Sequence, residues 1–334
     1  MIFLTGGTGL VGSYILMMLM QEKKKVKALR RPSSSSSSCQ KIFSYYKLDN
    51  LFSKIIWCEG DINDIPSLEE NMKGCNTLIH AAALVSFQKS ELEELKKTNI
   101  EGTANVMNMA LSYNYKRCIY ISSVSTLGRD FQNQEVNEES YFRSNKNISN
   151  YAFSKFYAEQ EAWRVSNEGL NVIILNPSII LGPGNWDKGS SKIFQRIYNG
   201  LKFYSTGSSG YVDVYDVAKI TLLFLENEIK NERYILNGTN ITFRKAFNKI
   251  ADELGVNRAT IKVTPFLKEL AWRLDQIKSF LTGRPSLLTQ ETANSAMKKV
   301  SYSSLKVQKY LDYKFVPFDA TIKEYCTFFK NDLI

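Results

Sequence analysis

The sequence predicts an α/β fold, in which a doubly wound parallel sheet carries helices on both faces and a smaller, mainly helical region follows. Three observations predict it. Short apolar runs alternate with longer helical stretches through the first half of the chain. A glycine-rich turn directly follows the first apolar run. From Phe243 onward the pattern is mainly helical. A chain of 334 residues is long enough for one large domain and a smaller one.

The elements follow in order along the chain. Seven short apolar runs are expected as strands: Met1–Thr5, Val26–Leu29, Ile55–Cys58, Thr77–Ala82, Arg117–Ser122, Asn171–Asn176 and Arg233–Asn237. Helices are expected at Leu10–Gln21, Glu91–Ser112, Tyr151–Asn167 and Ile220–Asn227. The serine run Ser33–Ser38 is of low complexity and is expected as a loop. Right-handed helical crossovers would join the parallel strands.

This order also predicts the domain organisation. Residues 1–177, with a return segment at 211–238, are expected to form a dinucleotide-binding domain. Residues 178–210 and 239–334 are expected to form the substrate-binding domain.

The composition is that of an ordinary globular protein, with 44% hydrophobic and 23% charged residues. The net charge of +10 fits either a nucleic-acid or membrane surface or a solvated lysine-rich surface. We favour the solvated surface, with no nucleic-acid partner, because no basic helix or aromatic-basic array appears. Five scattered cysteines indicate reduced thiols in the cytoplasm. With His80 as the single histidine, no metal site is expected. No apolar stretch reaches the length of a membrane span, so no stable membrane insertion is expected.

The strongest local signal is the segment Thr5-Gly6-Gly7-Thr8-Gly9-Leu10-Val11-Gly12, which joins the first strand to a helix. Gly6 would permit the tight turn, Gly9 would let the backbone approach a pyrophosphate, and Gly12 would let the helix lie close to the strand. Free amides at the helix start would face the negative charge. No Gly-Lys-Ser/Thr follows, so a kinase-type phosphate loop is excluded. The segment therefore predicts a Rossmann dinucleotide site whose candidate contacts are Gly6, Thr8, Gly9, Leu10, Val11 and Gly12.

The end of the second strand indicates which dinucleotide binds. NAD-binding domains place a carboxylate there to hold the ribose 2′-hydroxyl, but this sequence has Arg30 and Arg31. Guanidinium groups would bind a 2′-phosphate. NADP(H) is therefore favoured and NAD(H) stays open. In the alternative reading both arginines face solvent and Asp49 or another acid approaches the ribose.

The reactive groups come from a Tyr-Lys pair four residues apart, Tyr151 and Lys155, on one helix face. The spacing alone is weak evidence, because five such pairs occur, starting at Tyr151, Tyr198, Tyr215, Tyr302 and Tyr310. Only Tyr151 opens a helix shortly after a strand that ends in hydroxyls, Ser122-Ser123. Ligands bind at the carboxyl ends of parallel strands, so Ser123, Tyr151 and Lys155 are expected around one crevice with the glycine loop.

Those three side chains fit carbonyl–alcohol interconversion. Tyr151 would give its proton to the carbonyl oxygen, or take it back in reverse. A free phenol has a pKa of about 10, and Lys155 with a positive nicotinamide ring would lower it by stabilising phenolate. Ser123 would hydrogen-bond the substrate oxygen, and Lys155 would also grip the nicotinamide ribose.

With these motifs the chain resembles the extended short-chain dehydrogenase/reductase family. Within that family it is most similar to the dihydroflavonol-reductase-like and NAD-dependent epimerase/dehydratase members. The resemblance covers nearly the whole chain. Its carrying segments are Thr5–Gly12, Gly60–Ile62, His80–Ala83, Asn99–Asn105, Ser122–Gly128, Tyr151–Lys155, Asn176–Ser178, Leu181–Gly184 and Tyr211–Ala218.

The resemblance implies further contacts. Asp61 and Ile62 would contact adenine. His80, Ala81 and Ala82 would line the path of the pyrophosphate and ribose, with His80 more structural than catalytic. Asn99 would orient the active-site helix or contact the cofactor. Pro177 and Ser178 would border the nicotinamide carboxamide, or form only a domain-boundary turn. The family also suggests a homodimer through helices such as Asn150–Val165.

Three functions stay open. The first is an NADP(H)-dependent oxidoreductase acting on a small, largely apolar substrate. The second is a sugar-nucleotide epimerase or dehydratase with tightly bound NAD. Members acting on sugar nucleotides commonly carry an arginine just before the residue aligned with Tyr211, whereas Gly210 precedes it here. The third is a non-catalytic dinucleotide sensor, which would not need all three reactive side chains.

Overall fold

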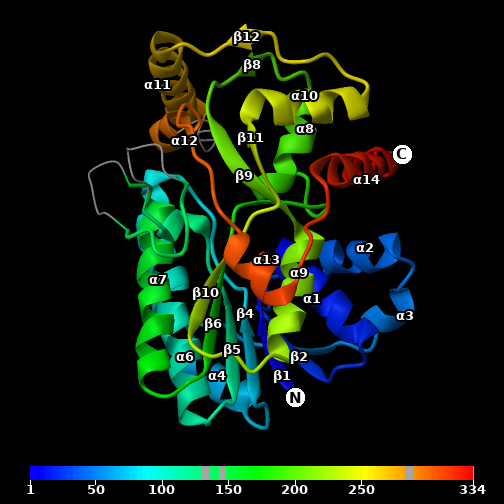
Figure 1. Ribbon diagram of the computed structural model, residues 1–334, viewed down its shortest axis with the longest axis vertical. Helices are drawn as coiled ribbons and strands as arrows, with labels where there is room; N and C mark the ends of the chain where they lie inside the picture. The colour runs from blue at the N-terminus through cyan, green and yellow to red at the C-terminus, as the bar shows by residue number, and fades with distance from the viewer. Residues whose placement is uncertain (129–134, 143–147, 283–288, 334) are drawn as a thin grey trace.

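The computed structural model describes residues 1–128, 135–142, 148–282 and 289–333. A seven-stranded sheet fills its lower half in Figure 1, and a mixed group of helices and short strands lies above. Every strand pair in this sheet is parallel, and the order is β10-β6-β5-β4-β1-β2-β3. The strands are β1 (Ile2–Thr5), β2 (Val26–Arg30), β3 (Ile56–Glu59), β4 (Thr77–His80), β5 (Arg117–Ile121), β6 (Val172–Pro177) and β10 (Glu232–Leu236). The predicted doubly wound parallel sheet is confirmed.

Helices cover both faces of the sheet (Figure 1). One face carries α4 (Ile65–Met72), α6 (Gly102–Ser112) and α7 (Asn150–Asn167); the other carries α1 (Leu10–Gln21), α2 (Ser37–Tyr45), α3 (Asp49–Phe52) and α9 (Val214–Leu225). Helix α1 is buried from Gly12 to Met20 and packs against α9. Helix α1 carries apolar residues on most of its faces because the sheet lies on one side of it and neighbouring helices lie on the others.

Three local expectations differ from the structure. The stretch Glu91–Ser112 is interrupted, because α5 (Leu92–Leu95) passes through a π-turn at Lys96–Glu101 before α6 begins. The serine run is not all loop, because α2 begins at Ser37 and buries Cys39. Helix α9 begins at Val214 instead of Ile220, because Asp213 caps it by accepting a 2.8 Å hydrogen bond from the Tyr215 amide.

The upper part is mainly helical around two small sheets. One sheet joins β7 (Ile179–Leu181), β9 (Ser208–Asp213) and β11 (Thr239–Thr242); the other pairs β8 (Phe203–Tyr204) with β12 (Ile261–Lys262). The helices are α8 (Lys192–Tyr198), α10 (Phe243–Leu254), α11 (Pro265–Thr282), α12 (Gln290–Ser295), α13 (Leu305–Leu311) and α14 (Phe318–Asn331). Most of the segment 129–147 lies outside the described residues. Within the described ranges, no helix combines the length and the apolar character needed to cross a membrane.

Candidate active site

One large cleft of about 2310 Å³ runs from the glycine-rich turn to the upper helices. It opens over the carboxyl ends of β1 and β4, where the strand order reverses direction. Crevices of this kind are the ligand sites of doubly wound sheets. Most of the sequence-predicted residues line it, namely Gly6, Thr8, Gly9, Leu10, Val11, Gly12, Arg30, Arg31, Asp61, Ile62, Ala81, Ala82, Ser123, Tyr151, Lys155, Pro177 and Ser178.

The glycine turn is a close backbone cradle. Gly6 adopts φ +77°, and a Cβ there would lie 2.5 Å from the backbone of Ala81 and Ala82. A Cβ on Gly12 would lie 2.1 Å from the Gly6 carbonyl oxygen. Glycine at 12 therefore lets the first turn of α1 approach the loop itself, and side chains at either position would fill the cradle.

Ser123 follows β5 and is held there because both its side chain and its carbonyl oxygen accept hydrogen bonds from neighbouring residues. Its Oγ accepts from the Ser125 amide at 3.1 Å, which caps the short 3-10 turn Val124–Thr126. Its carbonyl oxygen accepts from Thr126 Oγ1 at 2.9 Å and from Asn176 Nδ2 at 3.0 Å. The Ser123 hydroxyl therefore stands at a rigid turn on the rim of the cleft.

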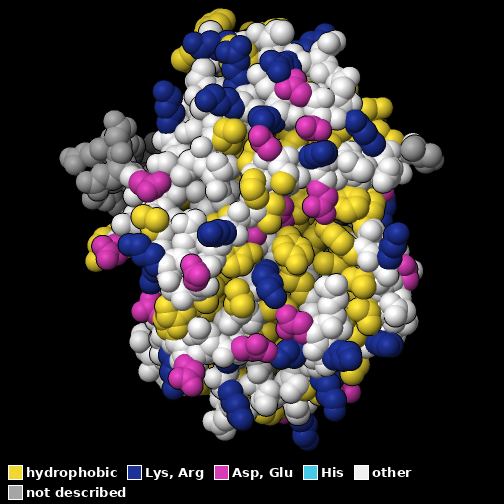
Figure 2. Space-filling model, turned by 45° about the vertical axis from the view of Figure 1, so that its right-hand side comes forward, with side chains coloured by type: hydrophobic (Ala, Val, Ile, Leu, Met, Phe, Trp, Pro, Cys, Tyr) yellow, Lys and Arg dark blue, Asp and Glu magenta, His cyan; other side chains and the backbone are white. Residues whose placement is uncertain are grey.

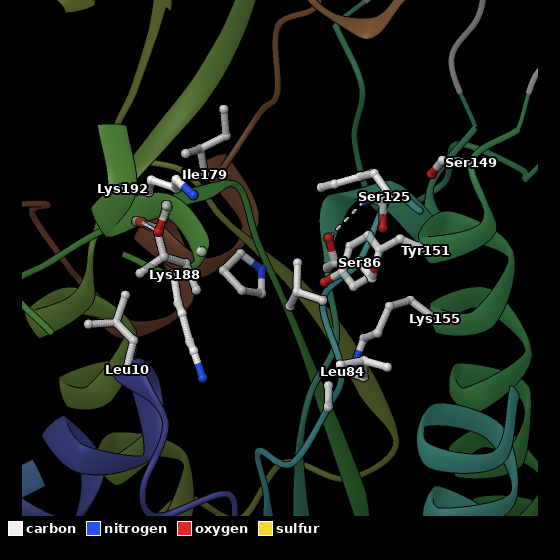
Figure 3. Close-up of a pocket in the computed structure, with 18 of the residues that line it drawn as sticks. Leu10, Leu84, Ser86, Ser125, Ser149, Tyr151, Lys155, Ile179, Lys188 and Lys192 are labelled. Atoms are coloured by element: carbon white, nitrogen blue, oxygen red, sulfur yellow. Dashed lines mark hydrogen bonds between the residues drawn. The ribbon is translucent and has the colours of Figure 1, made fainter. Parts of the chain in front are cut away.

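Tyr151 and Lys155 extend from α7 into the cavity (Figure 3). Ser149 starts this helix by accepting the Ala152 amide at 3.0 Å. Burial raises the pKa of Tyr151 to about 12, and a hydrogen bond with Ser123 opposes the rise. Lys155 is 1% exposed. It donates to Tyr120 Oη at 2.8 Å and to the Ile121 carbonyl at 2.9 Å. Burial lowers the pKa of Lys155 to about 7, and the negative charge of Glu159 opposes that shift.

Behind these groups lies a partly buried ion pair that sequence reasoning missed. Glu159 is fully buried and forms a salt bridge with Arg233 of β10. Its Oε2 accepts from Ser122 Oγ at 2.5 Å, Thr126 Oγ1 at 2.8 Å and Asn176 Nδ2 at 2.8 Å. The sequence does contain a signal for Glu159, because this residue follows Lys155 by four positions on the same helix and therefore lies on the same helix face.

Two expected cofactor contacts, His80 and Asn99, do not line the cleft. His80 Nδ1 lies 2.6 Å from Thr5 Oγ1, and Nε2 lies 2.9 Å from Thr103 Oγ1. Burial lowers the pKa of His80 to about 3, so the ring is neutral. Asn99 Oδ1 accepts the Leu84 amide at 2.7 Å, and its Nδ2 donates to Ser154 Oγ at 2.9 Å. Both side chains are turned inward because their polar atoms are satisfied by neighbouring elements.

The two arginines at the end of β2 differ in their partners. Arg30 Nη2 donates to Glu59 Oε1 of β3 at 3.0 Å, whereas Arg31 is exposed. Asp49, the expected alternative acid, accepts a hydrogen bond from Ser44 and does not line the cleft. Glu59 is thus the acid that pairs with Arg30.

The lining fits a dinucleotide. The glycine cradle leaves room for a pyrophosphate at the start of α1. Two hydroxyls on the lining, Ser125 Oγ and Ser178 Oγ, are buried without a hydrogen-bond partner among the described residues. Buried polar groups are normally satisfied, so these hydroxyls indicate that a polar ligand completes the site.

Comparisons with known proteins agree with this geometry. Residues 2–237 match the NAD dependent epimerase/dehydratase family. A putative dihydroflavonol 4-reductase from Synechocystis sp. is 30% identical over 317 residues, 92% of this chain and 88% of that protein. Cinnamoyl-CoA reductase 1 from Petunia hybrida is 28% identical over 57% of this chain and 59% of that protein.

Solved structures show the same architecture over the full length. The crystal structure of gox2253 gives a TM-score of 0.81 at 28% identity, over 99% of this chain and 98% of that chain. UDP-glucose 4-epimerase from Thermotoga maritima, with UDP-glucose, gives 0.79 at 20% identity, over 100% and 99%. The family match and the reductase relatives also identify the class of enzyme. This chain belongs to the NAD-dependent epimerase/dehydratase family and is an NAD(P)-dependent oxidoreductase of the extended short-chain dehydrogenase/reductase type.

Proposed function

We propose that this enzyme interconverts a carbonyl and an alcohol on a small, largely apolar substrate and uses NADP(H). The observation that carries the proposal is the convergence of Ser123, Tyr151 and Lys155 on one cleft that begins at the glycine cradle. The relatives named as reductases support the direction of the chemistry.

The side chains divide the proton chemistry among them. The carbonyl carbon would receive its hydride from the nicotinamide ring when the dinucleotide is bound. Tyr151 gives its phenolic proton to the carbonyl oxygen, and Ser123 donates a hydrogen bond that holds this oxygen in place. The resulting phenolate is stabilised by the Lys155 ammonium and is reprotonated from solvent. The high pKa of Tyr151 in this structure means that the phenol is present as a proton donor at neutral pH.

The proposed cofactor preference rests on Arg30 and Arg31. Both line the cleft at the end of β2, and this strand end carries no carboxylate. The Arg30–Glu59 pair leaves the Arg31 guanidinium as the main group available to a 2′-phosphate, with Arg30 fixed beside it.

A sugar-nucleotide epimerase is the alternative, and the structure offers a physical reason against it. A Cβ at Gly210 would lie 2.1 Å from Asn237 Oδ1. An arginine therefore does not fit at the position where sugar-nucleotide members commonly carry one. Ser208 and Ser209 face the same cleft instead.

The test is turnover by the purified enzyme. NADPH oxidation would be followed at 340 nm with a panel of aldehydes and ketones, and the bound nucleotide would be released and identified. We expect net oxidation of NADPH, with a higher kcat/KM for NADPH than for NADH. Tightly bound NAD⁺ with no net turnover would favour the epimerase. Nucleotide binding without turnover of any substrate, including sugar nucleotides, would favour a sensor.

A further inference from the structure

Among the described residues that line the cleft, cations outnumber carboxylates. The carboxylates among these lining residues are Asp61 and Glu94. The cations on the upper walls are Lys188, Lys192, Arg196, Lys268, Lys298 and Lys299. On the face shown in Figure 2, by contrast, Lys and Arg side chains are scattered among Asp and Glu. Walls of low dielectric constant strengthen the field of the positive excess along this lining.

Two of these cations are placed opposite the reactive groups. Figure 3 shows Lys188 and Lys192 on the side of Ile179 and Leu10, across the cavity from Tyr151 and Lys155. Lys192 begins α8 and is half-buried, and Lys188 lies one turn earlier on the loop that leads into it. No ion pair involves either ammonium in the described part of the chain.

Lys188 and Lys192 carry the same charge and both line the cleft. Lys192 lies in the first turn of α8, whereas Lys188 has an extended backbone on the loop before it. Two like charges in one cleft repel each other, and walls of low dielectric constant increase the repulsion. An anion bound beside these ammonium groups would offset the repulsion and accept charge-assisted hydrogen bonds.

We propose that Lys188 and Lys192 form a subsite for an anionic group, a carboxylate or a phosphate, at the end of the substrate remote from its carbonyl. This inference rests on the proposed function and refines its substrate class: an apolar body between a carbonyl and an anion. The pyrophosphate of the cofactor is a second source of the same chemistry, because Lys188 lies on the Leu10 side of the cavity.

Two aldehydes that differ only in charge test the subsite, 4-formylbenzoate and its methyl ester. Each would be titrated into the enzyme–NADPH complex, with NADPH fluorescence reporting binding and absorbance at 340 nm reporting turnover. We expect the carboxylate to bind about tenfold more tightly than the ester, which is the effect of one charge pair in a partly solvated cleft. The preference should fall as salt is added.

The double variant Lys188→Met and Lys192→Met should lose this preference and bind the ester as before. Lys116→Met, which removes an exposed charge outside the cleft, serves as the control and should keep the preference. Equal binding of the two aldehydes, no binding of either, or an unchanged preference in the double variant overturns the subsite. Weaker binding of NADPH with unchanged aldehyde preference assigns the lysines to the cofactor and also overturns it. A retained preference without any turnover would instead count against the proposed reaction.

A second inference rests independently on the partly buried ion pair behind the reactive groups. The Glu159 carboxylate gathers Ser122, Thr126 and Asn176, and the last two donate to the Ser123 carbonyl oxygen. It also lies on the same helix as Tyr151 and Lys155. We infer that Glu159, held by Arg233, is a positioning residue that fixes the Ser123 turn and keeps the Lys155 ammonium charged.

Charged and titratable groups from several elements surround Glu159 and Lys155. Arg233 approaches from β10, Tyr120 from β5, and Lys155 and Tyr151 from α7, while Glu138 lies near Arg233 and neutral His80 near Lys155. Lys155 is the group whose protonation changes near neutral pH, because burial places its pKa at about 7. Removing the negative charge of Glu159 lowers that pKa further, so the ammonium is lost at a lower pH.

The test is the pH profile of kcat/KM for carbonyl reduction. Glu159→Gln should lower kcat by up to about 100-fold and move the alkaline decline of the profile to lower pH, with NADPH binding at pH 6 retained. Glu159→Asp keeps the charge, so its decline should stay in place. Glu161→Gln removes a surface carboxylate from the same helix and is the control. Should Glu159→Gln fail to fold, Thr126→Val tests the turn alone, and we expect lower kcat with an unmoved decline. An unmoved decline in Glu159→Gln, or unchanged kcat in Thr126→Val, overturns the inference.

Discussion

The two walls of the cleft are built in opposite ways. The reactive wall, formed by β5, β6 and α7, is largely buried, and most of its polar side chains are hydrogen-bonded to one another or to the backbone at 2.5–3.1 Å. The facing wall, formed by the loop before α8 and α8 itself, presents long lysine side chains without ion pairs in the described part of the chain. Chemistry requires groups that do not move, because a small misplacement costs rate. Recognition of a substrate tolerates side chains that order only on binding, at a cost in entropy.

The largest expected effect lies on the reactive wall. Tyr151→Phe removes the proton donor and keeps the ring that contacts Phe87. We expect kcat to fall by about 10³-fold, with NADPH affinity unchanged in a fluorescence titration. Tyr157→Phe, on the exposed side of the same helix, should retain full activity. Normal turnover by Tyr151→Phe would show that Tyr151 is not the proton donor and that the chemistry does not take place at this wall.

The next effect concerns charge on that wall. With the pKa of Lys155 lowered to about 7 by burial, the ammonium is present at lower pH and is lost as the pH rises through this value. The rate of carbonyl reduction should therefore fall on the alkaline side. In Lys155→Met we expect a loss of about 10²-fold and no remaining change in rate near pH 7. A Lys155→Met profile that still declines near pH 7 would place the titrating group elsewhere.

The next prediction compares the two arginines at the cofactor end of the cleft with the two lysines of the facing wall. Arg30→Asp combined with Arg31→Ala should weaken NADPH binding by about 10–100-fold and leave NADH binding nearly unchanged, because only NADPH carries the 2′-phosphate. Glu59→Gln frees Arg30 from its partner and should tighten NADPH binding slightly. Equal losses for both nucleotides would remove the 2′-phosphate assignment.

The smallest effect on catalysis is expected for a substitution of Asn99, which should change mainly the stability of the protein. Asn99→Ala removes the partner of the Leu84 amide and carbonyl and one of the two hydrogen bonds of the Ser154 hydroxyl, which still donates to the Tyr151 carbonyl. We expect the free energy of unfolding to fall by about 2 kcal/mol, measured by urea denaturation, while the preference between nucleotides stays the same. A fall confined to nucleotide affinity would mean that Asn99 contacts the cofactor after all.

Much of the fold could be predicted from the chain because its signals are local. The buried strands are continuous apolar runs, and the glycine-rich turn permits only a close strand–helix connection. The convergence of Ser123 with the Tyr151 helix could also be predicted, since parallel strands share one carboxyl edge. The exact starts of α2 and α9 could not, because burial of Cys39 and the Asp213 cap decide them.

What the sequence by itself determined is the set of chemical groups and the edge of the sheet at which they meet. Only the tertiary structure decided which of those groups face the cleft and which are turned inward. His80 and Asn99 have the chemistry of ligand contacts, but partners from distant segments satisfy them inside the protein. Glu59 meets Arg30, and Glu159 meets Arg233, 74 residues away. The physical reason is that a buried polar or charged group must find its partner within reach in space, and sequence spacing does not encode that distance.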